Sequence, residues 1–232
     1  MIAKVGRRAT PAKSVARKRT RMSTQARRAQ LLRCAVEASA DVGISRVGHV
    51  DVAERAHVSV PTVFAYFPTR QILVRAILRD VRRFYLELLR SVPREGKATD
   101  VAYALFWECT RRARTEPHYI RVWLDWSTAI REEIWQRYLK LWNEGVAEFK
   151  AVLDRGQRSG EIDRDLDTLM AARIVLGGAH TIGVMLFSGV DDAELEALAR
   201  HLVSGALHPS GVESREGRRR LSAHRRTSSR RA

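Results

Sequence analysis

The residues with the clearest chemical use lie between positions 59 and 70. Ser59 precedes a short predicted helix, Val60 to Phe67, whose first backbone amides lack partners inside the helix. A hydroxyl and free amides at a helix start are groups that bind phosphate. Arg70, which follows the predicted cap Thr69, is a second candidate for a phosphate contact. The helix positions expected to face a partner are Val60, Pro61, Thr62, Ala65 and Tyr66. These groups predict contacts to the phosphates and base edges of DNA.

This short helix needs a second helix to hold it. Apolar side chains recur at Val52, Ala56, Val58, Val63 and Tyr66. That spacing is typical of two short helices packed across a turn, with the second helix facing outward. We expect Ser59 to cap the second helix and Pro61 to lie in its first turn, while Pro68 ends it. Phe64 and Phe67 are expected to pack inward, and Tyr66 to reach a phosphate through its hydroxyl.

The net charge of +16 is concentrated in two terminal segments. Residues 1 to 33 hold 11 Lys and Arg and no acid, and residues 209 to 232 hold 8 Arg against two Glu. The middle of the chain is left with 23 basic and 24 acidic residues, so it is nearly neutral. Basic tails on a neutral body are expected of arms that bind a polyanion, although a merely solvated tail has the same composition.

The remaining sequence predicts helices throughout and no strand. Helices are expected at 23–42, 70–91, 99–114, 117–127, 135–153, 166–187 and 191–207. Asp165 is the expected cap of the helix that starts near 166, and Gly156 and Gly160 are expected to close the helix before it. We therefore predict an all-α fold of about nine helices. Its expected divisions are a disordered basic arm (1–22), a helix-turn-helix DNA-binding domain (23–68), a helical dimerisation and ligand-binding domain (69–208) and a disordered basic tail (209–232).

The run VSVPTVFAYFPTRQILV, residues 58 to 74, resembles the DNA-binding signature of the TetR family of bacterial regulators. The preceding GHVDVAERAHVSV and the arm RTRMS are similar to a narrower branch, the LuxR/HapR-type quorum-sensing master regulators of vibrios. The resemblance covers about residues 17 to 207 and is strongest up to Phe84. It implies a homodimer on double-stranded DNA with a pseudo-palindromic operator, acting in the cytoplasm as a transcriptional regulator.

The resemblance also assigns roles to single residues in the DNA-binding part. It places Arg19 and Arg21 of the arm in the minor groove, where guanidinium groups suit a narrow, electronegative channel. Three positions depart from the pattern. His57 stands where the turn usually holds Gly, Pro61 replaces a small residue, and Ala65 replaces a hydrogen-bonding Asn. Because Ala cannot read adenine as Asn does, we expect a different operator sequence.

An apolar cavity is the second site that the sequence suggests. Its expected lining is Phe84, Cys109, Trp123, Trp126, Trp142 and Ala179. Aromatic residues at helical spacing are more often plain core, but the segment VWLDWSTAIREEIW is similar to the part of the vibrio branch that lines a pocket for small apolar molecules. Phe84 and Trp126 fall on pocket positions of that branch, whereas Gly145 and Ala179 replace its Asn and Cys.

The last two long helices are the expected dimer surface. The first brings Gly177, Gly178 and Gly183, which allow a close approach, and the second carries a seam of leucines at 195, 198 and 202. The resemblance implies a two-fold four-helix bundle there. The alternative is that both seams belong to the core of one chain.

Several other classes of protein fit poorly. Histidines are scattered without metal-ligand spacing, and there is no phosphate loop, so we expect no enzyme, metal or cofactor. Cys34 and Cys109 read as reduced, buried thiols, and no stretch is long and apolar enough to favour a membrane span. Three alternatives stay open: an organelle transit peptide at the N-terminus, a local repressor released by a ligand, and an architectural protein that coats DNA.

Overall fold

The computed structural model describes residues 22–130 and 133–207, and these residues form nine α-helices and no strand. The helices are α1 (Thr24–Val42), α2 (His49–Ala56), α3 (Val60–Tyr66), α4 (Arg70–Ser91), α5 (Ala98–Thr115), α6 (Pro117–Thr128), α7 (Trp135–Ser159), α8 (Thr168–Phe187) and α9 (Asp192–Leu207). The prediction of an all-α fold is confirmed. Arg19, Arg21 and the basic tail 209–232 lie outside the described residues.

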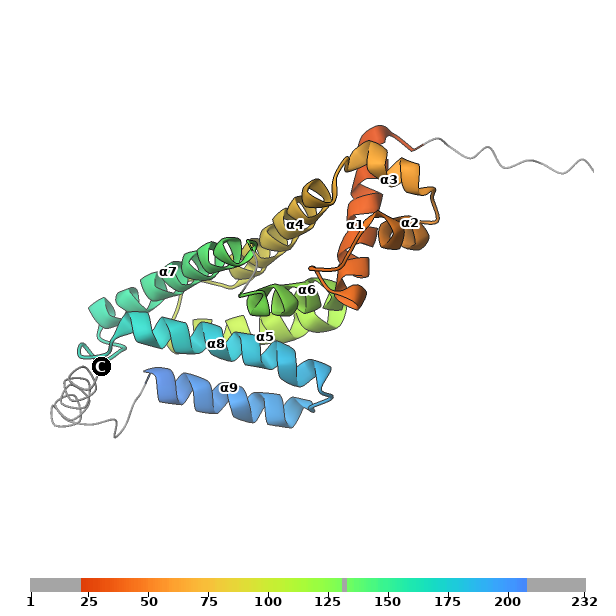
Figure 1. The fold of residues 1–232 in the computed structure, drawn as a ribbon. Helices are drawn as coiled ribbons and strands as arrows, with labels where there is room; N and C mark the ends of the chain where they lie inside the picture. The colour runs from red at the N-terminus through yellow and green to blue at the C-terminus, as the bar shows by residue number, and fades with distance from the viewer. Residues whose placement is uncertain (1–21, 131–132, 208–232) are drawn as a thin grey trace, which may run out of the picture.

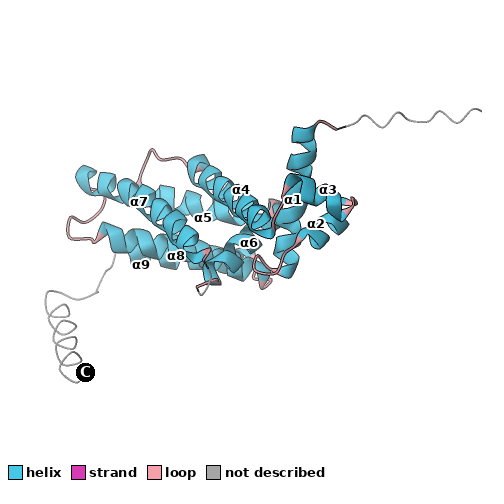
Figure 2. Ribbon diagram, turned by 45° about the horizontal axis from the view of Figure 1, so that its top comes forward, coloured by secondary structure: helices cyan, strands magenta, loops and turns pink. Residues whose placement is uncertain are grey.

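The helices form two connected groups. Helices α1, α2 and α3 pack together at one end of the molecule, and α4 leads away from them into the rest of the chain (Figure 1). There α5, α6, α7 and α8 pack against one another, and α9 covers α5 and α8. Figure 2 shows the same arrangement from another side, with α1 standing beside α2 and α3. Helix α6 contacts α1 as well as the other group, so it joins the two groups a second time.

Local signals fix most helix ends. The Ser23 hydroxyl accepts a hydrogen bond from the Ala26 amide at 3.1 Å, and Thr69 accepts one from Ile72 at 3.2 Å. The Thr69 cap agrees with the sequence-based expectation, and the Ser23 cap agrees with the expected start of the first helix near residue 23. Two expectations near α7 and α8 were wrong. Helix α8 is capped by Asp167 instead of Asp165, and α7 continues through Gly156 to Ser159.

The reason that α7 continues through Gly156 is packing. Gly156 is buried inside the helix, where an added Cβ would lie 2.9 Å from the Ile162 side chain. The glycine there makes room for the returning chain, while Gly160, with φ of +80°, ends the helix. The core of the molecule runs from Leu31 and Val52 in the first group to Leu153 and Val175 in the second.

Candidate nucleic-acid interface and effector cavity

Helices α2 and α3 are joined by a tight turn with a left-handed residue at its start. His57 has φ of +52° and ψ of +48°, as expected from its place where glycine is common. The Val58 amide donates to the Ala53 carbonyl at 3.0 Å, which closes the turn. Val52 and Val63, one from each helix, are completely buried. Helix α3 is therefore held by its inner face, and its outer face is left free.

His49, at the start of α2, fixes the far end of α3, and sequence reasoning missed it. Its Nε2 donates to the Phe67 carbonyl at 2.6 Å, and its ring stacks on Phe64 with centroids 3.8 Å apart. Phe67 is fully buried, as expected, but Phe64 keeps 45% of its surface exposed. Because the partners are 18 residues apart, local sequence patterns carry no sign of this contact.

The outer face of α3 presents the residues that the sequence singled out. Ser59, Pro61 and Ala65 are exposed, and Val60, Thr62 and Tyr66 are half-buried. The expected cap is wrong in one respect, because the Ser59 side chain accepts no hydrogen bond from a backbone amide of α3. Its hydroxyl instead lies 2.8 Å from the Thr62 hydroxyl. The two hydroxyls form one polar group at the N-terminal end of the helix, where Pro61 has no amide hydrogen and the Thr62 amide donates to the Ser59 carbonyl at 2.9 Å.

Arg70 makes contacts inside the fold that the sequence did not predict. Its Nε donates to the Val47 carbonyl at 2.9 Å, and its guanidinium also donates to the Ser45 carbonyl at 2.5 Å. The side chain thus ties the start of α4 to the loop between α1 and α2. These bonds use Nε and Nη2, while Nη1 makes no hydrogen bond within the described residues, so the phosphate contact of Arg70 stays a prediction beside its role in the fold.

The same loop is also held from α6. The Asp125 carboxylate accepts a hydrogen bond from the Ile44 amide at 2.7 Å, across 81 residues of sequence. The loop from Gly43 to Val47 is therefore fastened twice, by Arg70 of α4 and by Asp125 of α6.

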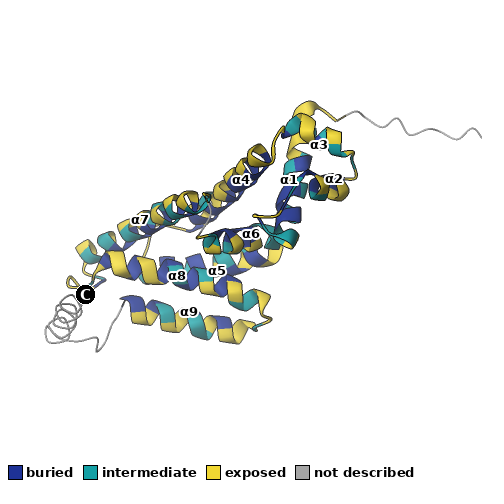
Figure 3. Ribbon diagram, viewed as in Figure 1, coloured by how far each residue is buried: buried dark blue, intermediate teal, exposed yellow. Residues whose placement is uncertain are grey.

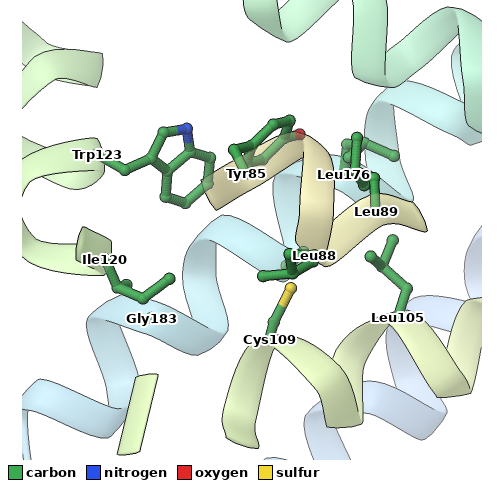
Figure 4. A pocket seen from close by; sticks show the side chains of 10 residues that line it. Tyr85, Leu88, Leu89, Leu105, Cys109, Ile120, Trp123, Leu176 and Gly183 are labelled. Carbon is green, nitrogen blue, oxygen red and sulfur yellow. The ribbon is translucent and has the colours of Figure 1, made fainter. Parts of the chain in front are cut away.

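An apolar cavity lies between α4, α5, α6 and α8 (Figure 4). Of the six residues predicted to line it, Cys109, Trp123 and Ala179 do so. The other lining residues are Tyr85, Leu88, Leu89, Leu105, Ile120, Leu176 and Gly183. The free space is about 20 Å³, which is enough for one water molecule and too small for a larger one. The cavity exists, but this conformation is nearly closed.

The other three predicted lining residues do not face this cavity. The Trp126 ring is buried and donates to the Ile134 carbonyl at 2.8 Å. Phe84 stacks on Tyr119 with centroids 4.6 Å apart, and Trp142 packs near Tyr138. Spacing along a helix predicted that these aromatic side chains are packed, but it could not distinguish a cavity wall from plain core.

The polar groups at the cavity are neutral. Burial raises the pKa of the Cys109 thiol to about 12, although the residue keeps some surface exposed elsewhere. Burial also raises the pKa of the Tyr85 hydroxyl, and that hydroxyl has no hydrogen-bond partner among the described residues. The Tyr85 ring stacks on Trp123, which makes an edge contact with His180, and burial lowers the pKa of that histidine. The site offers apolar walls, and the unpaired Tyr85 hydroxyl lies beside Gly145 of α7, where an added Cβ would be 2.7 Å from its oxygen.

Helix α8 presents a partly apolar outer face. Met170, Ile174 and Val184 keep between 42% and 49% of their surface exposed, and Gly177 and Thr181 lie between them at helical spacing. Figure 3 shows exposed stretches along this helix. Among the described residues, α8 is the one helix that is long and apolar enough to cross a membrane. Core helices of soluble proteins can have the same length and composition.

The expected leucine seam of α9 is partly covered by its own chain, since Leu198 and Leu202 are half-buried. Leu195 and Val203 are buried, and the Leu202 side chain packs so close to α8 that a Cβ on Gly178 would lie 2.5 Å from it. The close approach predicted at Gly178 and Gly183 is thus within one chain. Only Gly177 of the three has open space, with nothing within 4 Å of an added Cβ. Within one chain, α8 keeps an exposed apolar stripe and α9 is covered on one face, and pairing of two copies through these helices stays a prediction.

Comparison with known proteins agrees with this architecture. The family model of bacterial regulatory proteins, tetR family, matches residues 31–77, from the middle of α1 into α4. The HTH-type transcriptional regulator LuxR of Vibrio harveyi is 31% identical over 201 residues, which cover 86% of this chain and 96% of that protein.

Solved structures share the fold at lower identity. The transcriptional regulator FadR from Bacillus subtilis, in complex with stearoyl-CoA, aligns with a TM-score of 0.63 at 19% identity, covering 80% of this chain and 99% of that one. The regulator CifR, bound to a 26-base-pair operator DNA, aligns with a TM-score of 0.64 at 17% identity, covering 75% and 94%. The helix-turn-helix, the all-helical body and the identity to the Vibrio harveyi protein together mean that this chain belongs to the TetR family of DNA-binding transcriptional regulators.

Proposed function

We propose that this regulator acts in the cytoplasm as a homodimer on a pseudo-palindromic operator, with α3 in the major groove of each half-site. The observation that carries the proposal is the fixed, outward-facing N-terminal half of α3, with the Ser59 and Thr62 hydroxyls at its end. The Ser59 and Thr62 hydroxyls would bind phosphate, while Pro61, Ala65 and the edge of Tyr66 would touch bases or backbone. Arg19 and Arg21 would add minor-groove contacts.

A recognition helix of only two turns makes few contacts to bases. A second copy of the protein on the same duplex is therefore needed for sequence specificity. The outer face of α8 is a suitable surface for pairing with this second copy, because exposed apolar side chains alternate there with the small Gly177. Exposed apolar stripes of this kind favour a protein partner. Two-fold pairing through α8, with α9 beside it, would present two recognition helices to half-sites about 34 to 36 Å apart.

The cavity supports a small apolar effector with one hydrogen-bond acceptor. Its walls are aliphatic and aromatic, and the buried Tyr85 hydroxyl has no partner among the described residues. An unpaired buried donor costs about 1 to 3 kcal/mol, so a ligand that supplies an acceptor is favoured beyond its apolar contact. The stearoyl-CoA bound to the Bacillus subtilis regulator is a precedent, in another protein of this fold, for an acyl chain.

Because the cavity is nearly closed, an effector would have to displace part of its wall. Trp123 is a wall residue from α6, and Asp125 on the same helix holds the loop between α1 and α2. Displacing Trp123 would therefore strain the Asp125 contact and tilt the DNA-binding helices. Such coupling suits a local repressor released by its ligand as well as a quorum-sensing global regulator.

The test of the operator proposal starts by selecting duplexes that the full-length protein retains from a random pool. Thr62→Ala and Tyr66→Ala should each abolish specific binding in fluorescence anisotropy and leave the dimer intact in size-exclusion chromatography. Gln136→Ala, at an exposed position of α7, is the matched control and should bind like the wild type. Normal footprints from both α3 variants would reject the recognition-helix assignment.

Salt dependence separates this proposal from an architectural role. A regulator should prefer its selected site over unrelated duplexes by about 10³ or more at a fixed salt concentration. An architectural DNA-coating protein would show a steep salt slope with little preference among sequences.

For the effector, straight-chain fatty acids and alkanes of matched length are suitable probes in thermal unfolding. The wild type should be stabilised more by the acid than by the alkane, and Tyr85→Phe should lose that preference while still responding to chain length. If no probe of either kind shifts the unfolding temperature or the DNA affinity, the cavity is a packing defect of the core.

A further inference from the structure

We propose that the groove between α1 and α4 binds a small elongated anion that carries a chain of phosphate groups. The groove has a volume of about 390 Å³, which is within the usual range of ligand sites. Its walls carry five arginines and one acid: Arg28, Arg79, Arg82, Arg83, Arg90 and Asp80. It is separate from both the recognition helix and the apolar cavity.

Most of this positive charge is not neutralised by the protein. Arg82 pairs with Glu144 at 2.7 Å, and Arg83 pairs with Asp80 at 2.5 Å. Within the described ranges, Arg28, Arg79 and Arg90 have no carboxylate within ion-pairing distance. Arg28 instead lies over the Phe67 ring at 5.3 Å. Three guanidinium groups therefore face one groove without a counter-charge.

The single acid in the groove does not change this balance. Asp80 is buried, and one carboxylate oxygen accepts from Arg83 while the other accepts from the Tyr119 hydroxyl at 2.8 Å. Both oxygens are thus used inside the fold. Arg79 lies three and four residues from Arg82 and Arg83 on α4, and like charges at these spacings repel. A bound anion would relieve that repulsion, so the electrostatic energy of the arginines is lower when the groove is occupied.

The shape of the groove selects the type of anion. Arg79 and Arg90 are eleven residues apart on one helix, or about 16 Å along its axis. That length suits a chain of phosphates better than a single one, and guanidinium groups bind phosphate oxygens in pairs. Leu32 and Leu86 add apolar surface between the arginines. A DNA duplex is convex and would touch only the rims of such a groove.

The position of the groove lets its ligand act on DNA binding. One wall belongs to α1, which packs on the DNA-binding helices, and the other belongs to α4, which leads into the body. An anion that contacts both walls fixes the angle between the two groups of helices. Free polyphosphate and nucleoside triphosphates share the required chemistry, and the presence of a nucleoside distinguishes them.

Calorimetric titration of the full-length protein with tripolyphosphate and with ATP, at about 0.15 M salt, tests the proposal. The basic tails also attract anions, so the comparison uses two double variants of equal charge. Arg79→Gln/Arg90→Gln changes the groove. Arg137→Gln/Arg164→Gln changes exposed positions on α7 and in the loop after it, and keeps both tails. Circular dichroism verifies that each variant is folded.

Saturable binding of tripolyphosphate by the wild type is expected, with affinity lower by about tenfold in the groove variant and within about twofold of wild type in the control. Tighter binding of ATP than of tripolyphosphate would identify a nucleotide as the ligand, and the reverse would identify free polyphosphate. Absence of saturable binding, or equal losses in both variants, would overturn the proposal. So would a groove variant that loses affinity for non-operator duplex but keeps its affinity for tripolyphosphate.

Discussion

At the scale of single residues, long-range hydrogen bonds decide how the DNA-binding helices are held. Asp125 and Arg70 each reach the loop between α1 and α2 from a different helix. Neither role follows from its local sequence, which showed only an acid in an amphipathic helix and an arginine after a cap. By contrast the caps Ser23 and Thr69, whose partners lie three residues away, were predictable because the interaction is local.

Removing the Asp125 carboxylate should loosen the DNA-binding helices. Asp125→Ala leaves the Ile44 amide without its acceptor, and we expect a loss of about 1 to 2 kcal/mol in the free energy of unfolding. Operator affinity should fall with it. Asp125→Asn, whose amide oxygen can still accept, should retain most of both. Urea denaturation and fluorescence anisotropy measure the two effects. Equal stability of all three proteins would show that this hydrogen bond does not hold the loop.

Glu108 should make the fold sensitive to acid. Hydrogen bonds from Arg111, and further ones from Arg112 and Ser91, lower the pKa of Glu108 from its ordinary 4.5 to about 2. Because its pKa is lower in the folded state, the carboxylate stabilises the fold above pH 4.5, and this contribution is lost as the pH falls from 4.5 toward 2.

Glu108→Gln tests that dependence. The variant should be less stable at pH 7 by about 1 kcal/mol, after allowance for solvent screening. Its free energy of unfolding should depend less on pH than that of the wild type between pH 4.5 and 2. Parallel curves for the two proteins, from chemical denaturation at a series of pH values, would assign the acid sensitivity to other carboxylates.

At the scale of helices, the neighbouring glycines Gly177 and Gly178 of α8 have different surroundings. A Cβ on Gly178 would lie 2.5 Å from Leu202 and 3.2 Å from Phe106, whereas a Cβ on Gly177 would meet nothing within 4 Å. Gly178→Ala should therefore be less stable than Gly177→Ala by about 1 to 3 kcal/mol in chemical denaturation, the usual cost of overpacking. Gly177→Ala should weaken only dimerisation, which sedimentation measures. Stabilities in the reverse order would contradict the packing of α9 on α8.

The helices themselves were largely predictable, and their partners were not. The expected helix ranges, such as 70–91 and 117–127, agree with the observed bounds within a few residues for most helices. The apolar stripe of α9 correctly indicated a buried face, but a stripe does not say whether another chain or the same chain covers it. The same limit explains the cavity, where Cys109, Trp123 and Ala179 were placed correctly and Trp126 was not.

At the scale of the whole molecule, the net positive charge lies in the two terminal segments of the sequence and not in the folded body. The nearly neutral body positions α3, and the basic segments at both ends of the sequence are expected to supply attraction to DNA that does not depend on base sequence. Because α3 exposes few hydrogen-bonding side chains, a large share of the affinity is expected to come from the arm.

Deleting residues 1 to 21 should weaken operator binding and reduce its dependence on salt. For each phosphate that the arm no longer neutralises, the slope of log affinity against log salt should become shallower by about 0.9. Arg19→Gln/Arg21→Gln tests the two assigned residues without removing the other basic residues of the arm. Deletion of residues 209 to 232 is the control for general charge. An operator affinity that is unchanged without residues 1 to 21 would dismiss the arm as a DNA-binding element.

The small size of the effector cavity also has a consequence for timing. A site with about 20 Å³ of free space admits a ligand only after its wall has moved, so the protein must open before binding. At high ligand concentration the association rate would then level off at the opening rate of the protein. The delay between the appearance of a signal and the release of DNA would be set by the motion of Trp123 and its neighbours, and no excess of effector would shorten it.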